Sequence, residues 1–183
     1  MPRRSSMKES CRAGTPLPAQ QAEPAQMCGR KHLRRLHRVF GDLPGPVFFL
    51  TCCVRNRRRV LAQARVVRIL VDAWASAPDV YGWLVGRYAV MPDHVHFFAA
   101  PCREDAKDLS QFIASWKRWT KRHIREQVVP SFQWQAESFD HLLRSDESYE
   151  QKWEYVRANP VRAGLVAEPE EWAFEGELNV LER

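Results

Sequence analysis

The segment that organises this chain spans residues 81–100 and reads YGWLVGRYAVMPDHVHFFAA. Aromatic and β-branched residues dominate both of its ends, as is typical of strands. The MPD between them is a tight connection whose proline fixes where the second strand begins. The sequence therefore predicts one strand over residues 81–92 and another over residues 94–100. Because the second strand lies mid-chain, we expect it to be central in its sheet.

Hydrophobic periodicity on either side of this strand pair predicts helices and further strands. The expected elements are a strand over 47–54, helices over 62–77 and 108–127, an irregular strand or hairpin over 132–144, and a helix over 146–159 capped by Asp146 and ended by Pro160. The order β-α-β-β-α-β-α predicts an α+β fold. We expect a ferredoxin-like sandwich, in which helices pack on one face of an antiparallel sheet of four to five strands.

The composition excludes several classes of protein. The chain has 183 residues, 45% of them apolar, which fits one folded domain. It contains neither the roughly 18 uninterrupted apolar residues of a membrane span nor a signal peptide. Its five cysteines include no CxxC pair, which argues against a disulfide framework and a zinc ribbon. These features predict a cytoplasmic protein with no membrane partner.

The net charge of +6 resides at the N-terminus. Residues 1–44 contain nine Lys/Arg and three Asp/Glu, whereas the rest of the chain contains 19 of each. We expect residues 1–44 to form a disordered basic arm, or in part to lie upstream of the true start codon. The folded domain is expected over residues 45–175, with a C-terminal tail over residues 176–183.

Two clusters of basic residues interrupt this neutral domain. They comprise Arg55, Arg57, Arg58 and Arg59 after the first strand, and Lys117, Lys121 and Arg125, spaced by four, along one side of the helix over 108–127. Either cluster alone is typical of a solvated charged face. Two patches on a neutral domain favour a polyanion bound on one side.

Two histidines lie one residue apart in the second predicted strand. Strand side chains alternate between faces, so His94 and His96 point to one side while Val95 and Phe97 pack into the core on the other. Two such imidazoles can chelate one metal ion, and the alternative is two partly exposed histidines without a ligand. We expect Asp93 to point away from them and to belong to the turn. A complete metal site needs a further ligand.

The last predicted helix offers that ligand and a nucleophile. Tyr155 and Asn159 are four residues apart and share one face. Tyr149, Trp153 and Val156 share a different face and have the spacing of core contacts. Tyr149 is therefore interpreted as structural. Tyr155 is either a functional side chain or a tyrosine at the rim of an amphipathic helix.

Four blocks of sequence resemble the REP-associated tyrosine transposases, a bacterial branch of the single-tyrosine transposases with a His-hydrophobic-His (HUH) motif. The blocks, in order, are FFLTCCVRNRRRVL (48–61), AVMPDHVHFFAAP (89–101), WQAESFDHLLRSDESY (134–149) and EYVRANPVRAGLV (154–166). The resemblance runs from about residue 38 to residue 172. This chain departs from the family in its longer N-terminal arm.

The resemblance implies an HUH endonuclease fold and a catalytic site. His94, His96 and Asn159 would hold a metal ion, and Tyr155 would be the nucleophile. Two imidazoles, one amide oxygen and open positions suit Mg²⁺ or Mn²⁺. The family cleaves and rejoins single-stranded DNA beside hairpins called repetitive extragenic palindromes, which implies a nucleoid location. Its members look monomeric, so we expect a monomer, with a dimer as the alternative.

The DNA contacts follow from this interpretation. Both basic clusters would hold phosphates. Candidate base-stacking residues are Trp116, Trp119, Trp134 and Phe139, although the spacing of Trp116 and Phe139 favours core packing. Arg144 either contacts DNA or pairs with a neighbouring carboxylate. Two other functions remain open: a domesticated relative that binds hairpin DNA without cutting it, and a hydrolase that uses water.

Overall fold

The structure, a computed structural model, describes residue 43, residues 45–143 and residues 149–181. The predicted basic arm lies outside the described residues except for Leu43, and so do Arg144 and Asp146. Within the described part of the chain, no helix combines the length and the apolar character that crossing a bilayer requires.

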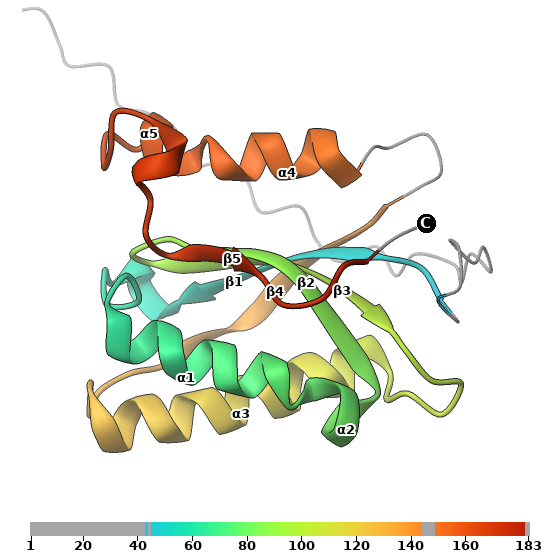
Figure 1. The fold of residues 1–183 in the computed structure, drawn as a ribbon. Coiled ribbons are helices and arrows are strands. Elements are labelled where there is room, and N and C mark those ends of the chain that lie inside the picture. Colours follow the sequence, from blue (N-terminus) through green and yellow to red (C-terminus); the bar gives the residue numbers. More distant parts are fainter. Residues whose placement is uncertain (1–42, 44, 144–148, 182–183) are drawn as a thin grey trace, which may run out of the picture. The chain divides into compact units, whose positions relative to one another are not determined.

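Five strands form one antiparallel sheet in the order β4-β1-β3-β2-β5 (Figure 1). The strands are β1 (Phe48–Val54), β2 (Trp83–Val90), β3 (His94–Pro101), β4 (Trp134–Leu142) and β5 (Glu175–Glu177). The helices are α1 (Ala64–Ala75), α2 (Ala77–Tyr81), α3 (Leu109–Gln127), α4 (Tyr149–Arg157) and α5 (Asn159–Arg162), with short 3₁₀ turns η1 (Arg55–Arg57) and η2 (Pro169–Glu171). The α+β prediction is confirmed, and so is the central position of the histidine strand, because β3 has two strands on each side.

Two predicted helices are each followed directly by a second, short helix. The helix predicted over 62–77 corresponds to α1, and α2 follows it and is capped by Gly82, whose φ of 75° is a left-handed conformation that glycine adopts without strain. Tyr81 is therefore the last residue of a helix and not the first of a strand. The helix predicted over 146–159 corresponds to α4, which ends at Arg157, before Pro160. Pro160 lies in the first turn of α5, where its fixed φ favours a helix start, so a second helix begins there as well.

Helices α1 and α3 cover one face of the sheet. Trp74 of α1 stacks on Trp116 of α3, with ring centroids 5.6 Å apart and planes within 5° of parallel. Val95 and Phe97 of β3 are fully buried in the same core, as the alternation of strand side chains predicted. The core position expected for Trp116 is likewise confirmed.

Helix α4 lies on the opposite face, so the prediction of helices on one face holds only for α1 and α3 (Figure 1). Tyr149, Trp153 and Val156 face the sheet, as their spacing predicted, and pack in one cluster with Phe49 and Phe98. The physical reason is that alternate residues of β1 and β3 present a second apolar surface, which is stable only when another element covers it.

The fold continues beyond the boundary predicted at residue 175. Strand β5 pairs with β2, and the indole of Trp172 donates to the Val90 carbonyl at 3.2 Å. Leu181 is only 4% exposed and belongs to the cluster beneath α4. Residues 176–181 are therefore part of the sheet and core, and the prediction of a separate tail over these residues is wrong.

Candidate functional site

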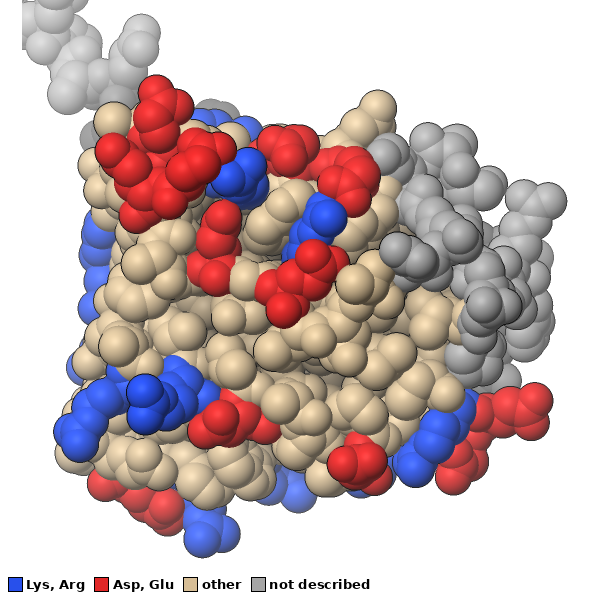
Figure 2. All heavy atoms as spheres, in the orientation of Figure 1, with Lys and Arg blue, Asp and Glu red and all other residues tan. Residues whose placement is uncertain are grey.

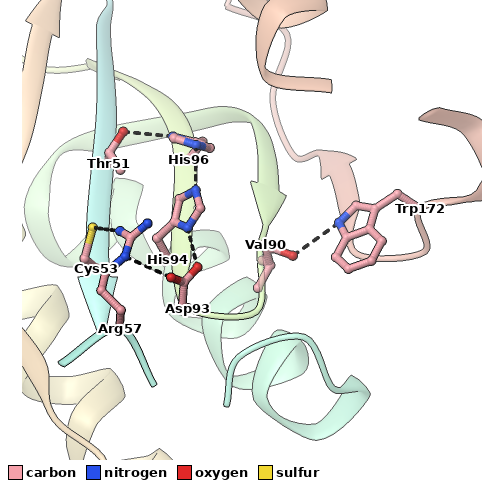
Figure 3. Close-up of polar contacts among 8 residues, drawn as sticks. All are labelled: Thr51, Cys53, Arg57, Val90, Asp93, His94, His96 and Trp172. Carbon is pink, nitrogen blue, oxygen red and sulfur yellow. Dashed lines mark hydrogen bonds and ion pairs between the residues drawn. The ribbon is translucent and has the colours of Figure 1, made fainter. Parts of the chain in front are cut away.

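His94 and His96 lie side by side on β3, on the same face as Phe98, which packs against α4. Their Nε2 atoms are 3.0 Å apart and their ring planes are nearly perpendicular, at 84° (Figure 3). The register between β1 and β3 places Cys53 opposite His94 and Thr51 opposite His96. Two adjacent strands thus build one polar patch on an otherwise apolar face.

The outer nitrogen of each imidazole also has a partner. The Nδ1–H of His94 donates to Asp93 Oδ1 at 2.7 Å, and Nδ1 of His96 lies 2.8 Å from the hydroxyl of Thr51 (Figure 3). The prediction that Asp93 points away is wrong, because Asp93 precedes the strand and is not bound by its alternation. A carboxylate can only accept, so the Nε2 of neutral His94 carries a lone pair, which accepts from the Nε2–H of His96 in this structure and becomes available to a metal when that proton moves to Nδ1 of His96.

Both imidazoles are neutral at pH 7. Burial, followed by the charges of His94, Arg57 and Arg162, lowers the pKa of His96 to about 3. Burial also lowers the pKa of His94, although the hydrogen bond to Asp93 opposes this shift. Neutral imidazole is the form that binds metal ions.

The geometry of the pair fits a metal ion. Metal–imidazole bonds are about 2.0–2.1 Å long, so two nitrogens 3.0 Å apart can bind one ion at roughly a right angle. No group of three or more His, Cys, Asp and Glu among the described residues could hold a metal. A third protein ligand from this part of the chain would therefore be of another type, and the amide of Asn159 satisfies that condition.

The arginine-rich loop is held against the histidine turn. The backbone N–H of Val54 donates to the Asp93 carbonyl at 2.8 Å, and Leu61 donates to that of Pro92 at 2.9 Å. Arg57 has a φ of 52°, which is uncommon for a residue with a side chain, and it directs the guanidinium back toward β1. Arg57 Nε pairs with Asp93 Oδ2 at 2.9 Å, and Nη1 donates to Cys53 Sγ at 2.8 Å (Figure 3).

The other predicted arginines of this loop are exposed around the same site. Arg55 donates to the side chain of Gln133, Arg58 donates to Ser131, and Arg59 is exposed as well. The structure therefore brings the first basic cluster and the histidine pair together.

The second basic cluster is not part of this site. Helix α3 packs on the opposite face of the sheet from the histidines, and there Lys121 is partly exposed while Arg125 caps the Pro130 carbonyl at 3.1 Å. Lys117 is 9% exposed, and its ammonium donates to three successive carbonyls of β4, those of residues 135–137. The prediction of Lys117 as a phosphate contact is therefore wrong, because its charge is used inside the fold.

The candidate base-stacking residues also divide into buried and exposed ones. Trp134 is 5% exposed and donates to Thr120, so it is a core residue. Trp119 is half-exposed on α3 and stacks on His123, with ring centroids 3.7 Å apart. Phe139 is 59% exposed, and the core position expected for it is wrong. Only Phe139 of these residues shares the histidine face.

Tyr155 and Asn159 lie at the junction of α4 and α5. Tyr155 is 60% exposed whereas Tyr149 is 8% exposed, which confirms that the two tyrosines occupy different environments. Tyr155 belongs to α4 and Asn159 begins α5, so they do not share one helix as predicted. Arg162 contacts both: it donates to the Tyr155 carbonyl and to Asn159 Oδ1, and its guanidinium carbon lies 4.0 Å from the centroid of the Tyr155 ring.

Arg162 is the functional candidate that the sequence analysis missed. Its position three residues after Asn159 was a usable signal, because residues three apart are neighbours on a helix. Its charge is one of those that lower the pKa of His96, which links the α4–α5 junction to the histidine pair electrostatically. The candidate site therefore comprises the histidine pair on β3, its partners on β1 and in the arginine loop, and the α4–α5 junction as its electrostatic neighbour.

An acidic groove lies elsewhere on the domain, between α4 and the β2–β5 edge. Its charged residues are Arg87, Glu150, Glu154, Arg157, Glu175 and Glu177. Figure 2 shows acidic side chains gathered over this region, with two cations between them. Arg87 pairs with Glu150 at 2.6 Å and Arg157 pairs with Glu175 at 3.3 Å, so both arginines are neutralised. This surface would repel a phosphate backbone.

Comparison with known proteins gives three informative matches, although no family model matches the chain. The chain is 24% identical over 133 residues to a REP-associated tyrosine transposase of Escherichia coli, covering 72% of this chain and 76% of that protein. It is 21% identical over 140 residues to a putative REP-associated tyrosine transposase of Haemophilus influenzae, covering 71% and 78%.

A solved structure of a REP-associated tyrosine transposase bound to a REP hairpin superposes with a TM-score of 0.61 at 22% identity. The match covers 78% of this chain and 82% of that one. The chain is therefore a distant homologue of these transposases and shares the fold of the solved structure.

Proposed function

We propose that this distant homologue of the REP-associated tyrosine transposases cleaves and rejoins single-stranded DNA beside REP-type palindromic hairpins. Tyr155 is the nucleophile, and His94, His96 and Asn159 hold Mg²⁺ or Mn²⁺. The observation that carries the proposal is the pair of Nε2 atoms 3.0 Å apart, beside which Arg57 of the arginine loop pairs with Asp93. The charge of Arg162 acts on His96 of the same chain, which supports a site assembled within a monomer.

The chemistry begins with the exposed phenol of Tyr155. Its oxygen attacks a backbone phosphorus, the bond from phosphorus to the 3′ oxygen breaks, and a 5′-phosphotyrosine forms. The proton that the phenol loses balances the one that the departing 3′ oxygen gains as a hydroxyl. Because phenol is a better leaving group than an alkoxide, the reverse reaction rejoins the strand.

The remaining residues position the reactants. A bound divalent ion would polarise the scissile phosphate and stabilise the charge that develops in the transition state. Asp93 and Thr51 orient the two imidazoles, which are neutral and able to act as ligands. The exposed arginines of the loop after β1 supply phosphate contacts next to the site. The acidic groove between α4 and the β2–β5 edge would repel phosphates, so the DNA strand is not expected to cross that side of the domain.

The test is a covalent adduct between protein and DNA. The purified protein is incubated with a hairpin oligonucleotide and Mn²⁺, and the products are separated on a denaturing gel. We expect an adduct for the wild type and for Tyr149→Phe, whose ring stays in the core, and none for Tyr155→Phe. Absence of an adduct with every divalent ion would overturn the proposal.

The same gel separates the alternatives. Hairpin binding without cleavage would identify a domesticated DNA-binding protein. Cleavage without an adduct would identify a hydrolase that uses water. An adduct that survives Tyr155→Phe would leave the reaction class intact and overturn the choice of nucleophile.

A further inference from the structure

Arg162 is held at the junction of α4 and α5 by three contacts. Its Nη2 donates to Oδ1 of Asn159 and to the backbone carbonyl of Tyr155, and its guanidinium carbon lies 4.0 Å from the centroid of the Tyr155 ring. Its charge also reaches His96. One cation therefore touches the proposed nucleophile and one candidate metal ligand, and its charge acts on another.

The contact with Asn159 bears directly on metal binding. An amide oxygen has two lone pairs, and one lone pair of Asn159 Oδ1 accepts from the guanidinium. A divalent ion could use only the other lone pair, and it would then lie next to the charge of Arg162. Their like charges repel, so each weakens the binding of the other.

A DNA phosphate would relieve this repulsion. Guanidinium groups bind phosphate through paired charge-assisted hydrogen bonds, which are stronger than the bonds of Arg162 to the neutral oxygens of Asn159 and Tyr155. A phosphate that Tyr155 attacks must come close to its ring, and Arg162 lies against that ring. Such a phosphate would draw the guanidinium away from Asn159 and neutralise its charge.

We infer, on the basis of the proposed function, that Arg162 is a positioning residue that couples metal binding to DNA binding. Its charge lies beside Oδ1 of Asn159 and opposes the ion until a substrate phosphate neutralises the guanidinium, and the oxygen then binds the ion. The metal site therefore binds its ion tightly only when DNA is present. Because such coupling is reciprocal, the ion also tightens DNA binding.

The experiment measures Mn²⁺ affinity and not activity. Mn²⁺ is titrated, with the free ion followed by electron paramagnetic resonance, into Tyr155→Phe and Tyr155→Phe/Arg162→Gln proteins, with and without a hairpin oligonucleotide. The phenylalanine prevents cleavage and keeps the ring under Arg162. We expect DNA to tighten Mn²⁺ binding by on the order of tenfold in the first protein. In the second, the affinity should already be higher without DNA and should change less than about threefold on adding it.

Two further variants make the result specific. His94→Ala in the same background removes the site and reports the Mn²⁺ that binds to DNA alone. Arg157→Gln removes a nearby arginine that pairs with Glu170 and Glu175 outside the site, and should leave the coupling unchanged.

The failures are distinguishable. If Mn²⁺ binding is saturable and Arg162→Gln leaves its affinity unchanged or weakens it, only the role of Arg162 is overturned. If His94→Ala removes no Mn²⁺ binding, the metal site of the proposed function is overturned as well.

Discussion

Phe139 and His96 lie on the same face of the sheet, two strands apart, because both pair with Thr51 of β1. Neighbouring strands are about 4.8 Å apart, so roughly 10 Å separates their backbones. This is the scale of one or two nucleotides of an extended strand. An exposed aromatic ring at this distance from the candidate metal site is well placed to stack on an unpaired base.

Phe139→Ala should therefore weaken the binding of single-stranded DNA. Stacking of one base on an aromatic residue contributes about 1–3 kcal/mol, so we expect a loss of several-fold to about 100-fold in affinity. Fluorescence anisotropy with a labelled oligonucleotide measures it. Val80, which is 52% exposed on α2, provides the matched control, since Val80→Ala removes exposed apolar surface remote from the site. Equal effects of the two variants would contradict the stacking role.

Asp93→Asn should weaken metal binding without unfolding the protein. The carboxylate fixes the proton on Nδ1 of His94 and so keeps Nε2 unprotonated, whereas an amide can donate to Nδ1 and reverse the tautomer. Loss of such an outer partner costs about 10- to 100-fold in metal affinity. Calorimetric titration with Mn²⁺ checks this, with the exposed Asp79→Asn as control. Unchanged affinity would mean that Asp93 serves only to anchor Arg57.

Lys117→Met should destabilise the fold. The substitution keeps the aliphatic stem but leaves the carbonyls of residues 135–137 without their ammonium donor, beside the irregularity in β1–β4 pairing. Hydrogen bonds to a charged group contribute about 1.5–3 kcal/mol, and we expect a loss of that size in the free energy of unfolding. Urea denaturation measures it. Lys121→Met, on the same helix, should change it by less than about 0.5 kcal/mol. Similar values for both variants would show that Lys117 has no structural role.

The phenol of Tyr149 should make stability fall at alkaline pH. Burial raises the pKa of Tyr149 to about 12, against 10 for the exposed group. Between these values the unfolded chain loses the proton and the folded chain keeps it, so the free energy of unfolding decreases as the pH rises above 10.

The comparison of wild type with Tyr149→Phe isolates this effect from those of other tyrosines. We expect the stability advantage of the wild type to shrink by about 1.4 kcal/mol between pH 9 and pH 11, as measured by urea denaturation. A constant difference between the two proteins over this range would show that Tyr149 ionises as an exposed tyrosine does.

Local periodicity was sufficient for much of the fold. The two-residue repeat of β3 placed His94 and His96 on one face and Val95 and Phe97 in the core, and the structure agrees. Helical spacing likewise separated Tyr149, which is buried, from Tyr155, which is exposed. These inferences succeed because the direction of a side chain within a regular element depends on its own backbone alone.

What the sequence by itself determined, then, is the order of elements and the face on which each regular side chain lies. Only the tertiary structure decided which charges meet. The even spacing of Lys117, Lys121 and Arg125 gave no sign that Lys117 points inward, because the carbonyls that attract it belong to β4. The spacing of Arg162 from Asn159 indicated that these two residues are neighbours, but its effect on His96 could not be read from the sequence, since it depends on where α5 lies in the fold. Electrostatic partners are set by distance in space, and a local pattern contains no information about residues far along the chain.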